Sequence, residues 1–504
     1  MNKDVDICLL LEGTYPYVRG GVSSWVHQII SGLPELTFHL IFLGGHPDFY
    51  GDPVYELPDN VVGFDVHYLL SDQSRLKASP RSGRSKLFEA WGNFLSFFEN
   101  NQEPIPSDLL SEVSDFLGKK GHLSLADFLY SRASWDVLTE RYFDVAENQS
   151  FVDYFWTYRN IYQPLFILSR ISQNLPRAKV FHSVSTGYAG FLGALARQKN
   201  HCPFLLTEHG IYTKERKIDL AQASWIKDRH SLIDISMHRD MDITRKTWVR
   251  FFEQLGLTAY HQADKIIALY EGNRQRQHID GAPRQKTQVI VNGINIQRFH
   301  AAYEKRPDKP PLVVGLVGRV VPIKDIKTFI RTIRGAIEQL PMLEGWIIGP
   351  KEEDKDYVHE CELLIESLGL TNNVKLLGSQ NVAEILPKLG VMMLTSISEA
   401  QPLVLLEAMA AGIPCIATEV GACREIIDGA AGEDAALGSA GEIIPIASPV
   451  EGAQAIVKVL SNTDDWLKVG DIGKERVSHY YDEKIMYESY RNLYKEAING
   501  RDRV

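Results

Sequence analysis

Cysteines are few in this sequence, and none of them belongs to a recognisable framework. Five are scattered over the 504 residues, with no CxxC pair among them. A sparse, odd-numbered set excludes a disulfide-stabilised secreted scaffold and is typical of a reducing compartment, where cysteines serve as small buried apolar residues. We therefore expect a cytoplasmic protein.

Long apolar runs are absent as well. No stretch of 18 or more apolar residues occurs, so the sequence offers no candidate transmembrane helix. The opening MNKDVDICLLLEG has only a short apolar run flanked by acids, which indicates a strand rather than a signal peptide. Association with the inner membrane would be peripheral and would need a partner.

Positive charge is not in excess. The net charge of −10 argues against non-specific nucleic-acid binding, although a local basic pocket for a small anion is compatible with it. Apolar residues make up 44% of the chain and charged residues 23%, the balance of a globular protein with material for two large domains.

Several motifs of cofactor and metal chemistry are missing. The chain contains no GxGxxG, which makes a dinucleotide-dependent oxidoreductase the least expected class. It also contains no HExxH and no Cys/His cluster with zinc spacing. We expect neither a bound metal nor a cofactor.

The sequence does contain two sets of short apolar runs that alternate with helical patterns. The first set includes 6–11 and 38–43, and the second includes 312–317 and 345–348. Such runs indicate buried parallel strands in βαβ units. The predicted fold class is α/β, with two doubly wound Rossmann-like domains.

A polar, Pro-rich segment marks the domain boundary. Residues 301–311 read AAYEKRPDKPP, which suits an exposed linker. We predict an N-terminal domain at 1–300 and a C-terminal domain at 312–480. The last segment, 481–504, has a helical pattern and is expected to pack back on the first domain.

A helical insertion interrupts the first domain at about 70–170, where strand alternation is lost. Aromatic residues recur there at helical spacing. A local aromatic core is the simpler interpretation, because aromatic stripes of this kind are usually buried. A platform for an acceptor or a partner is the alternative.

The strongest chemical signal is SISEAQPLVLLEAMAAGIP, which follows the apolar run 391–395. Glu399 falls in a loop and Glu407 inside the following helix, roughly 10 Å away at about 1.5 Å per helical residue. Between them the helix start exposes backbone N–H groups, at Leu403 and Val404, that suit a diphosphate. The flanking carboxylates would accept hydrogen bonds from sugar and ribose hydroxyls. A capped helix with two solvated glutamates is the alternative.

A second signal is the segment GLVGRVVPIKD. Arg319 and Lys324 stand five residues apart in a loop that follows an apolar run. Arg grips a phosphate in a bidentate manner and Lys adds a compact charge, so the pair could neutralise a leaving diphosphate without a metal ion. Two unrelated surface cations are the alternative.

Weaker signals come from the first domain. The pair Gly20-Gly21 in the first βα turn lets a phosphate approach the backbone, although a plain loop explains it equally well. His182 and His209 each follow an apolar run, at the strand ends where open α/β sheets bind ligands. A histidine is more often structural, and we favour a ligand role for His209 over one for His182.

In combination these motifs resemble the retaining glycosyltransferases of family 4, which have the GT-B fold. Glu399 and Glu407 match the E-x7-E motif of that family, and the basic loop, the glycine pair, the histidine and Asn292 in VNGI match it too. The resemblance covers nearly the whole chain and implies two domains that face a central cleft. It departs at Asn295, where family members often have Asp.

The resemblance implies a role for each matched residue of the second domain. Glu407 would hold the ribose of a nucleotide-sugar donor, and Glu399 would hold the hydroxyls of the donor sugar. Arg319 and Lys324 would bind the diphosphate.

The remaining matched residues take their roles from the same resemblance. Gly21 would approach the diphosphate from the first domain, Asn292 would belong to the donor site, and His209 would contact the transferred sugar. The acceptor would bind to the first domain, and closure about the linker would exclude water. We expect retention of configuration by front-side attack, because the sequence offers no convincing nucleophile.

A narrower resemblance, to the glycosyltransferases of bacterial Pel exopolysaccharide synthesis, rests on LLEGTYPYVRGGVSSWVHQII and LLTEHGIYTKER. It implies a UDP-sugar donor, UDP-glucose first, a polysaccharide acceptor and a membrane-bound synthesis complex as partner. No single residue selects glucose over its epimers. The alternatives are a GT-B epimerase or phosphorylase, and a non-catalytic UDP-sugar-binding component of a synthesis complex.

Overall fold

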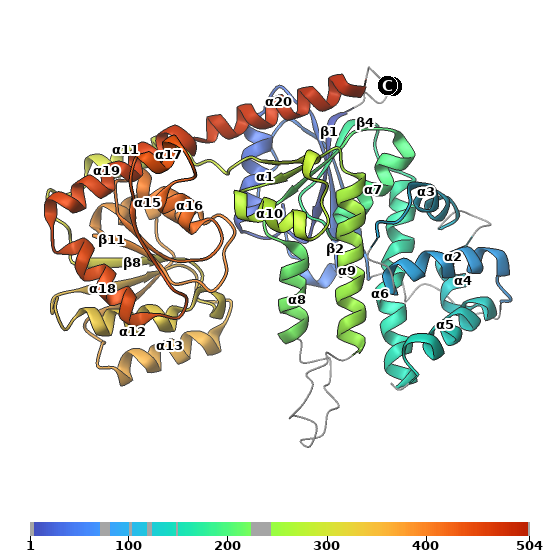
Figure 1. Cartoon of the computed structure of the whole chain (residues 1–504), viewed down its shortest axis with the longest axis horizontal. Helices are drawn as coiled ribbons and strands as arrows, with labels where there is room; N and C mark the ends of the chain where they lie inside the picture. Colours follow the sequence, from blue (N-terminus) through green and yellow to red (C-terminus); the bar gives the residue numbers. More distant parts are fainter. Residues whose placement is uncertain are drawn as a thin grey trace. The chain divides into compact units, whose positions relative to one another are not determined.

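The computed structural model describes residues 5–70, 81–99, 103–117, 123–147, 150–222 and 243–501. The chain divides into two compact units, each built on a parallel sheet with helices around it (Figure 1). The first unit comprises Met1–Ala268, Arg274–Val289 and Tyr490–Val504, and the second comprises Leu269–Asn273 and Ile290–Ser489.

The sheet of the first unit has seven strands in the order β3-β2-β1-β4-β5-β6-β7, all of them parallel. The inner strands read as continuous apolar runs because both faces of a parallel sheet are covered by helices. The strands are β1 (Val5–Glu12), β2 (Phe38–Gly44), β3 (Val61–Tyr68), β4 (Ala178–Ser183), β5 (Phe204–Glu208), β6 (Lys265–Ala268) and β7 (Thr287–Val289).

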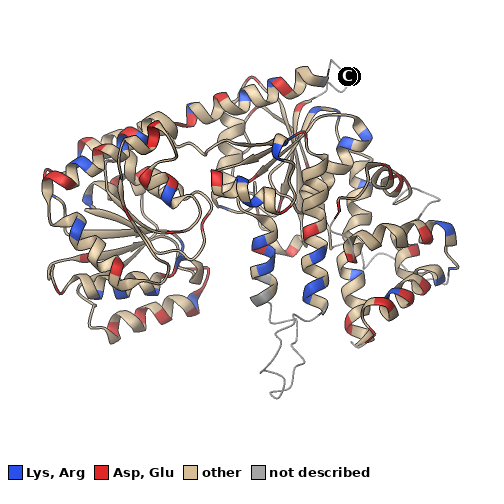
Figure 2. Ribbon diagram, in the orientation of Figure 1, with Lys and Arg blue, Asp and Glu red and all other residues tan. Residues whose placement is uncertain are grey.

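The connecting helices of this sheet are α1 (Gly21–Gly32), α7 (Tyr188–Asn200), α8 (Tyr212–Gln222), α9 (Ile243–Gln262) and α10 (Glu271–Ile279). Charge is unevenly spread over them. Lys and Arg residues recur on α8 and on the first half of α9, as Figure 2 shows. A chain of net negative charge thus carries a locally basic region in its first unit.

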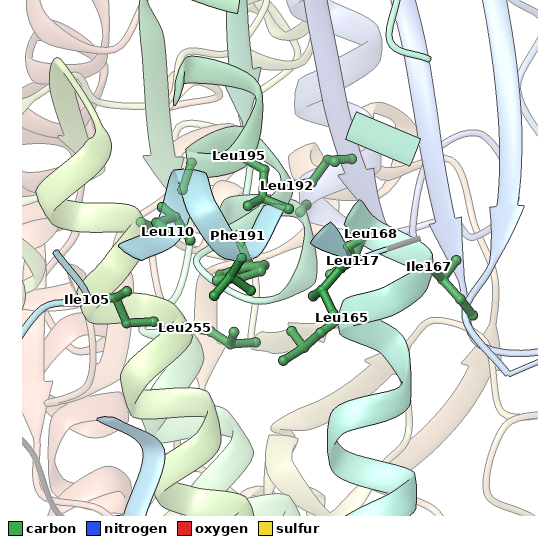
Figure 3. Close-up of a cluster of buried hydrophobic side chains, with 14 of the residues drawn as sticks. Ile105, Leu110, Leu117, Leu165, Ile167, Leu168, Phe191, Leu192, Leu195 and Leu255 are labelled. Carbon is green, nitrogen blue, oxygen red and sulfur yellow. The ribbon is translucent and has the colours of Figure 1, made fainter. Parts of the chain in front are cut away.

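A group of helices is inserted between β3 and β4: α2 (Ser85–Glu99), α3 (Ser107–Phe116), α4 (Leu125–Tyr130), α5 (Arg132–Val145) and α6 (Phe151–Ser172). Many of their aromatic side chains are buried, as the interpretation of a local core predicts. Leu165 of α6 belongs to the same cluster of buried side chains as Phe191 of α7 and Leu255 of α9 (Figure 3). Residues 71–80, at the start of the predicted insertion, lie outside the described residues.

The sheet of the second unit has six parallel strands in the order β10-β9-β8-β11-β12-β13. The strands are β8 (Val313–Val317), β9 (Glu344–Ile348), β10 (Val374–Gly378), β11 (Val391–Leu394), β12 (Cys415–Thr418) and β13 (Gly441–Ile444). The helices are α11 (Ile296–Glu304), α12 (Ile326–Ala336), α13 (Lys355–Ser367), α14 (Val382–Ile385), α15 (Leu403–Ala410), α16 (Cys423–Asp428), α17 (Glu433–Ala436), α18 (Pro449–Leu460) and α19 (Thr463–Tyr480).

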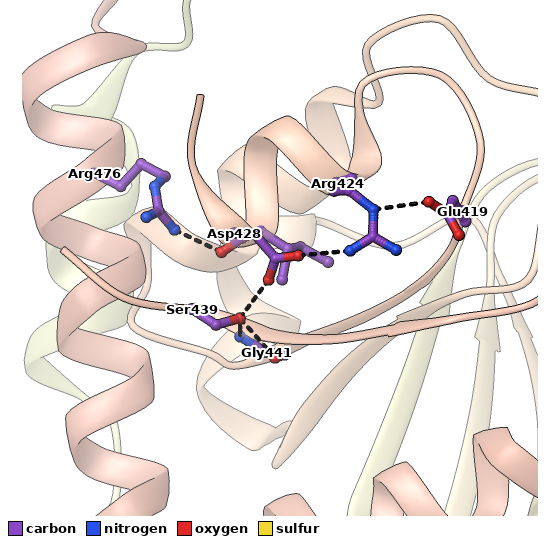
Figure 4. A network of polar contacts seen from close by, with 7 residues as sticks. Glu419, Arg424, Asp428, Ser439, Gly441 and Arg476 are labelled. Carbon is purple, nitrogen blue, oxygen red and sulfur yellow. Dashed lines mark hydrogen bonds and ion pairs between the residues drawn. The ribbon is translucent and has the colours of Figure 1, made fainter. Parts of the chain in front are cut away.

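A buried polar network ties α19 to α16 and α17. The guanidinium of Arg476 is fully buried, and it donates to the carboxylate of Asp434 at 2.6 Å and to the carbonyl oxygen of Ile427 at 2.5 Å. Figure 4 shows it beside the exposed pair of Arg424 and Glu419. The acceptors offset the cost of burying a charge, so removing either partner would be destabilising.

The last helix, α20 (Glu483–Arg501), is shared between the units: the second unit extends through Ser489, and Tyr490 onward belongs to the first. Within the first unit, Nδ1 of His182 lies 2.7 Å from the hydroxyl of Tyr494, and Nε2 lies 2.9 Å from Oγ1 of Thr207. Burial lowers the pKa of His182 to about 3. His182 is therefore a neutral member of a buried network, and it has a structural role of the kind that a histidine in a protein usually has.

The predicted α/β class with two parallel sheets is confirmed. The segment 301–311, which was expected to be an exposed linker, is partly helical. Its first residues belong to α11, and the second unit begins at Ile290. A helix forms there because Asn295 caps it, accepting the N–H of Arg298 at 3.1 Å, and because Phe299 and Ala302 are buried.

Two expectations from composition can be compared with the structure. All five cysteines are buried and unpaired, which confirms their interpretation as small apolar residues. Among the helices of the described residues, none combines the length and the apolarity needed to cross a membrane.

Candidate functional site

In the second unit, the loops that follow β8 and β11 meet because the two strands are neighbours. Nζ of Lys324 forms an ion pair with the carboxylate of Glu399, and the hydroxyl of Ser396 donates to the same carboxylate at 2.6 Å. Only 19% of the Lys324 side chain and 12% of the Glu399 side chain are exposed. The structure thus brings two of the predicted site residues into direct contact.

Backbone hydrogen bonds fix the start of the basic loop against β9. The N–H of Gly318 donates to the carbonyl of Ile348 at 2.9 Å, and the N–H of Val320 donates to that of Pro350 at 3.0 Å. Gly349 has a φ of 149°, and a Cβ added there would lie 2.0 Å from the carbonyl oxygen of Gly318. Glycine at this position is therefore what lets the two loops approach.

Arg319 forms an ion pair with a residue outside the motifs described above. Its Nη1 lies 2.5 and 2.8 Å from the two carboxylate oxygens of Glu353, in the loop after β9. Both side chains are half exposed, at 52% and 51%. Such a pair contributes only about 0–1 kcal/mol, so Arg319 can exchange Glu353 for an anionic ligand. The sequence did offer one signal for this partner: Glu353 follows the end of the apolar run that forms β9, and β9 pairs with β8.

Helix α15 begins without a side-chain cap, with Pro402 at its N-cap position. The first two helical residues are Leu403 and Val404, whose N–H groups have no acceptor within the helix. These groups and the positive end of the helix dipole favour an anion.

Glu407 lies one turn into α15 and is half-buried. Burial raises the pKa of its carboxyl to about 7, and the nearby positive charge of Arg298 opposes this in part. The group therefore titrates near neutral pH, which is common at functional sites. No local pattern in the sequence indicated Arg298, because its position depends on how α11 packs in the unit.

Asn292 forms hydrogen bonds with Gln401, which lies just before the start of α15. Its N–H donates to Oε1 of Gln401 at 2.8 Å, and its carbonyl accepts from Nε2 of the same side chain at 3.4 Å. Its Oδ1 is buried with no hydrogen-bond partner in the described ranges. Asn295, the residue that departs from the family pattern, acts as a helix cap, a role for which Asn and Asp are about equally suited.

In the first unit, His209 follows β5 and is 7% exposed. Neither ring nitrogen has a hydrogen-bond partner among the residues described. Burial lowers the pKa of His209 to about 3, and Trp25 packs edge-on against the ring with centroids 4.6 Å apart. A buried polar group without a partner costs about 1–3 kcal/mol, which a ligand hydroxyl would offset.

Helix α1 begins at Gly21, with Gly20 at its N-cap. At both glycines, no heavy atom lies within 4 Å of the place where a Cβ would be, so the helix start is open. Val22 in the first turn lines the same cavity as His209, which has a volume of about 880 Å³.

Family models match most of the chain. Residues 5–285, more than half of it, match the model described as a domain of unknown function (DUF3492). Residues 311–462, which include the basic loop and both glutamates, match the model described as glycosyl transferases group 1. The chain therefore belongs to the DUF3492 family, and its second unit is similar to the group 1 glycosyl transferases.

The chain has curated relatives of modest identity. N-acetyl-alpha-D-glucosaminyl L-malate synthase of Bacillus anthracis is 30% identical over 136 residues, which cover 27% of this chain and 34% of the relative. D-inositol 3-phosphate glycosyltransferase of Corynebacterium urealyticum is 25% identical over 300 residues, which cover 55% of this chain and 67% of the relative. The match thus spans about a third of the first relative and about two thirds of the second.

Solved structures of similar fold cover the chain almost completely. HepE of Anabaena in complex with UDP has a TM-score of 0.58 and 15% identity, over 97% of this chain and 100% of that one. Sucrose-phosphate synthase of Thermosynechococcus elongatus has a TM-score of 0.59 and 17% identity, over 98% and 100%. At these identities the likeness establishes the fold, and the predicted GT-B fold is confirmed.

Proposed function

We propose that this chain is a glycosyltransferase that transfers a hexose from a UDP-sugar, with UDP-glucose as the donor, to a growing exopolysaccharide. The observation that carries the proposal is the ion pair between Lys324, in the loop after β8, and Glu399, in the loop after β11. The loop that holds Glu399 leads to the uncapped start of α15. A diphosphate there would meet a cation and free N–H groups, and a sugar would meet a carboxylate.

Similar proteins support the choice of donor. HepE was solved with UDP and, in a further structure, with UDP-glucose. A UDP-Gal-dependent alpha-1,3-galactosyltransferase of Escherichia coli is 29% identical over 175 residues, 32% of this chain. The narrower resemblance to PelF, the Pel exopolysaccharide glycosyltransferase, supports a polysaccharide acceptor. On the same ground we propose a cytoplasmic protein, held at the inner membrane by a membrane-bound synthesis complex.

The proposed transfer retains configuration and needs no metal ion. The acceptor oxygen would bond to the anomeric carbon on the face from which the phosphate oxygen departs, and that oxygen would take the acceptor proton. Arg319 and Lys324 would neutralise the charge that grows on the departing UDP.

Calorimetry against UDP-, GDP- and ADP-sugars, followed by turnover with the best binder, tests the function. We expect UDP-glucose to bind best and turnover to be unchanged by EDTA; a strict need for a divalent ion would contradict the metal-free mechanism. Epimerised UDP-sugar or a dependence on phosphate would instead favour a GT-B epimerase or phosphorylase. Tight UDP binding without donor hydrolysis or transfer would favour a non-catalytic component.

The affinity for UDP-glucose is expected to rise as the pH increases from about 6 to about 8. Glu407 passes from the neutral acid to the carboxylate over this interval, because burial raises its pKa to about 7. The carboxylate accepts hydrogen bonds from the ribose hydroxyls more strongly than the neutral acid does. Calorimetry measures the effect, and the diphosphate of UDP-glucose, which is esterified at both ends, keeps the same charge throughout this range.

Glu407→Gln is the control for this titration. We expect its affinity to be about tenfold lower at pH 8 and nearly independent of pH, because the amide carries no charge to gain. An equal pH dependence in the variant and the wild type would show that another group is responsible.

A further inference from the structure

The cavity beside His209 has walls that the proposed donor site does not use. Its volume of about 880 Å³ lies near the upper end for ligand pockets, which leaves room for more than one sugar ring. It is lined from the loop after β1, from α7 and α9, and from the insertion helix α6.

One wall of the cavity is aromatic, and it is formed by Tyr188, Trp248 and Phe252. Trp248 stacks on Phe252 with ring centroids 5.7 Å apart and planes 23° apart, and Tyr188 meets Phe252 edge-on at 5.9 Å. Phe252 is buried by these contacts, whereas Tyr188 and Trp248 keep part of their surface exposed. Exposed ring surface of this kind suits the apolar C–H faces of sugar rings.

Thr14 and His209 both line this cavity, and each has buried polar atoms that can bond to a ligand. Oγ1 of Thr14 and both ring nitrogens of His209 are buried with no hydrogen-bond partner in the described part of the chain. The charged groups of the lining are already engaged: Glu12 accepts three hydrogen bonds, and Glu215 and Arg216 have partners of their own. A hydroxyl and an imidazole are therefore open to a ligand, and both can exchange hydrogen bonds with sugar hydroxyls.

The insertion completes this cavity. Asn160 and Pro164 of α6 line it, and the next residue, Leu165, belongs to the core shared with α7 and α9 (Figure 3). Because α6 is held by that core, its side of the cavity has a fixed position, as a binding site requires.

We propose that α6 and α9 make this cavity a saccharide site for the acceptor, with Tyr188 and Trp248 stacking on sugar rings and Thr14 binding a hydroxyl beside His209. The inference rests on the proposed function and deepens it. It makes Thr14 a further binding residue, and it gives the helical insertion the role of selecting which glycan is extended.

The test compares Trp248→Ala and Thr14→Val with a control, Trp135→Ala, which removes an exposed Trp of α5 that does not line this cavity. The probes are UDP-glucose as donor and maltotetraose and cellotetraose as acceptors. We expect the KM for the acceptor to rise about tenfold in Trp248→Ala and about threefold to tenfold in Thr14→Val. The Kd for UDP, measured by calorimetry, should stay at the wild-type value in all three variants.

The outcomes separate this inference from the proposed function. An unchanged acceptor KM in Trp248→Ala, an equal rise in the control, or no binding of either tetrasaccharide to the wild-type protein overturns the saccharide site while UDP binding stands. Failure of the wild-type protein to bind UDP or UDP-glucose overturns the proposed function. Circular dichroism of each variant confirms that it is folded, so that a loss of affinity is assigned to the site.

Discussion

Lys324→Ala is expected to lower turnover by about a hundredfold or more, the usual loss when a donor to transition-state charge is removed. Two effects add up in this variant. The departing UDP loses a compact cation, and the carboxylate of Glu399 is left with the hydroxyl of Ser396 but without its ion-pair partner. A poorly exposed, unbalanced carboxylate would then repel the diphosphate that the loop is proposed to receive. Release of UDP under saturating donor measures the effect.

Lys327→Ala is the matched control for that experiment. Lys327 stands three residues further on, and its Nζ pairs with the exposed carboxylate of Glu360 at 2.6 Å. Exposed pairs of this kind contribute about 0–1 kcal/mol, so turnover should stay close to that of the wild type. Lys324→Arg keeps the charge and should recover part of the lost rate. Near-normal turnover in Lys324→Ala would refute the proposed role of the basic loop.

Arg476→Ala is expected to cost the second unit about 3–5 kcal/mol of unfolding free energy. The substitution empties a fully buried site and removes the guanidinium donor from Oδ1 of Asp434 and from the carbonyl oxygens of Ile427 and Gly438. For a unit of this size the loss corresponds to a fall in melting temperature of about 10 °C. Differential scanning calorimetry measures it.

Arg424→Ala provides the comparison, since Arg424 belongs to the exposed side of the same region (Figure 4). It pairs with Glu419 and Asp428, and 53% of its side chain is exposed. We expect a loss below about 1 kcal/mol. Equal shifts in the two variants would mean that burial does not set the strength of this network.

Strands that are covered on both faces were predicted from the sequence with accurate bounds. Segments 6–11, 204–206 and 391–395 agree with β1, β5 and β11 to within two residues, because a buried parallel strand reads as an unbroken apolar run. Strand β3 was missed because it lies at the edge of its sheet, where most of its residues are partly exposed and its sequence, VVGFDVHY, is mixed. Strand β6, KIIA, is too short to stand out.

For the site, the sequence identified the loops but not the partners of their side chains. The spacing of Arg319 and Lys324 after an apolar run is a local property, which a single sequence displays. The pairing of Lys324 with Glu399, 75 residues later, and of Arg319 with Glu353 depends on the strand order β9-β8-β11. Nothing in a short motif specifies which later strands will flank β8.

The burial of His209 has a consequence for how the protein would behave in an acidified cell. An imidazole whose pKa is lowered to about 3 stays uncharged at any pH a living cell reaches, so the proposed contact of His209 with a sugar hydroxyl would be indifferent to acidity. Glu407, with a pKa raised to about 7, does change its charge when the pH falls. A fall in cellular pH would therefore weaken the capture of the sugar nucleotide while leaving the recognition of the sugar itself as it was.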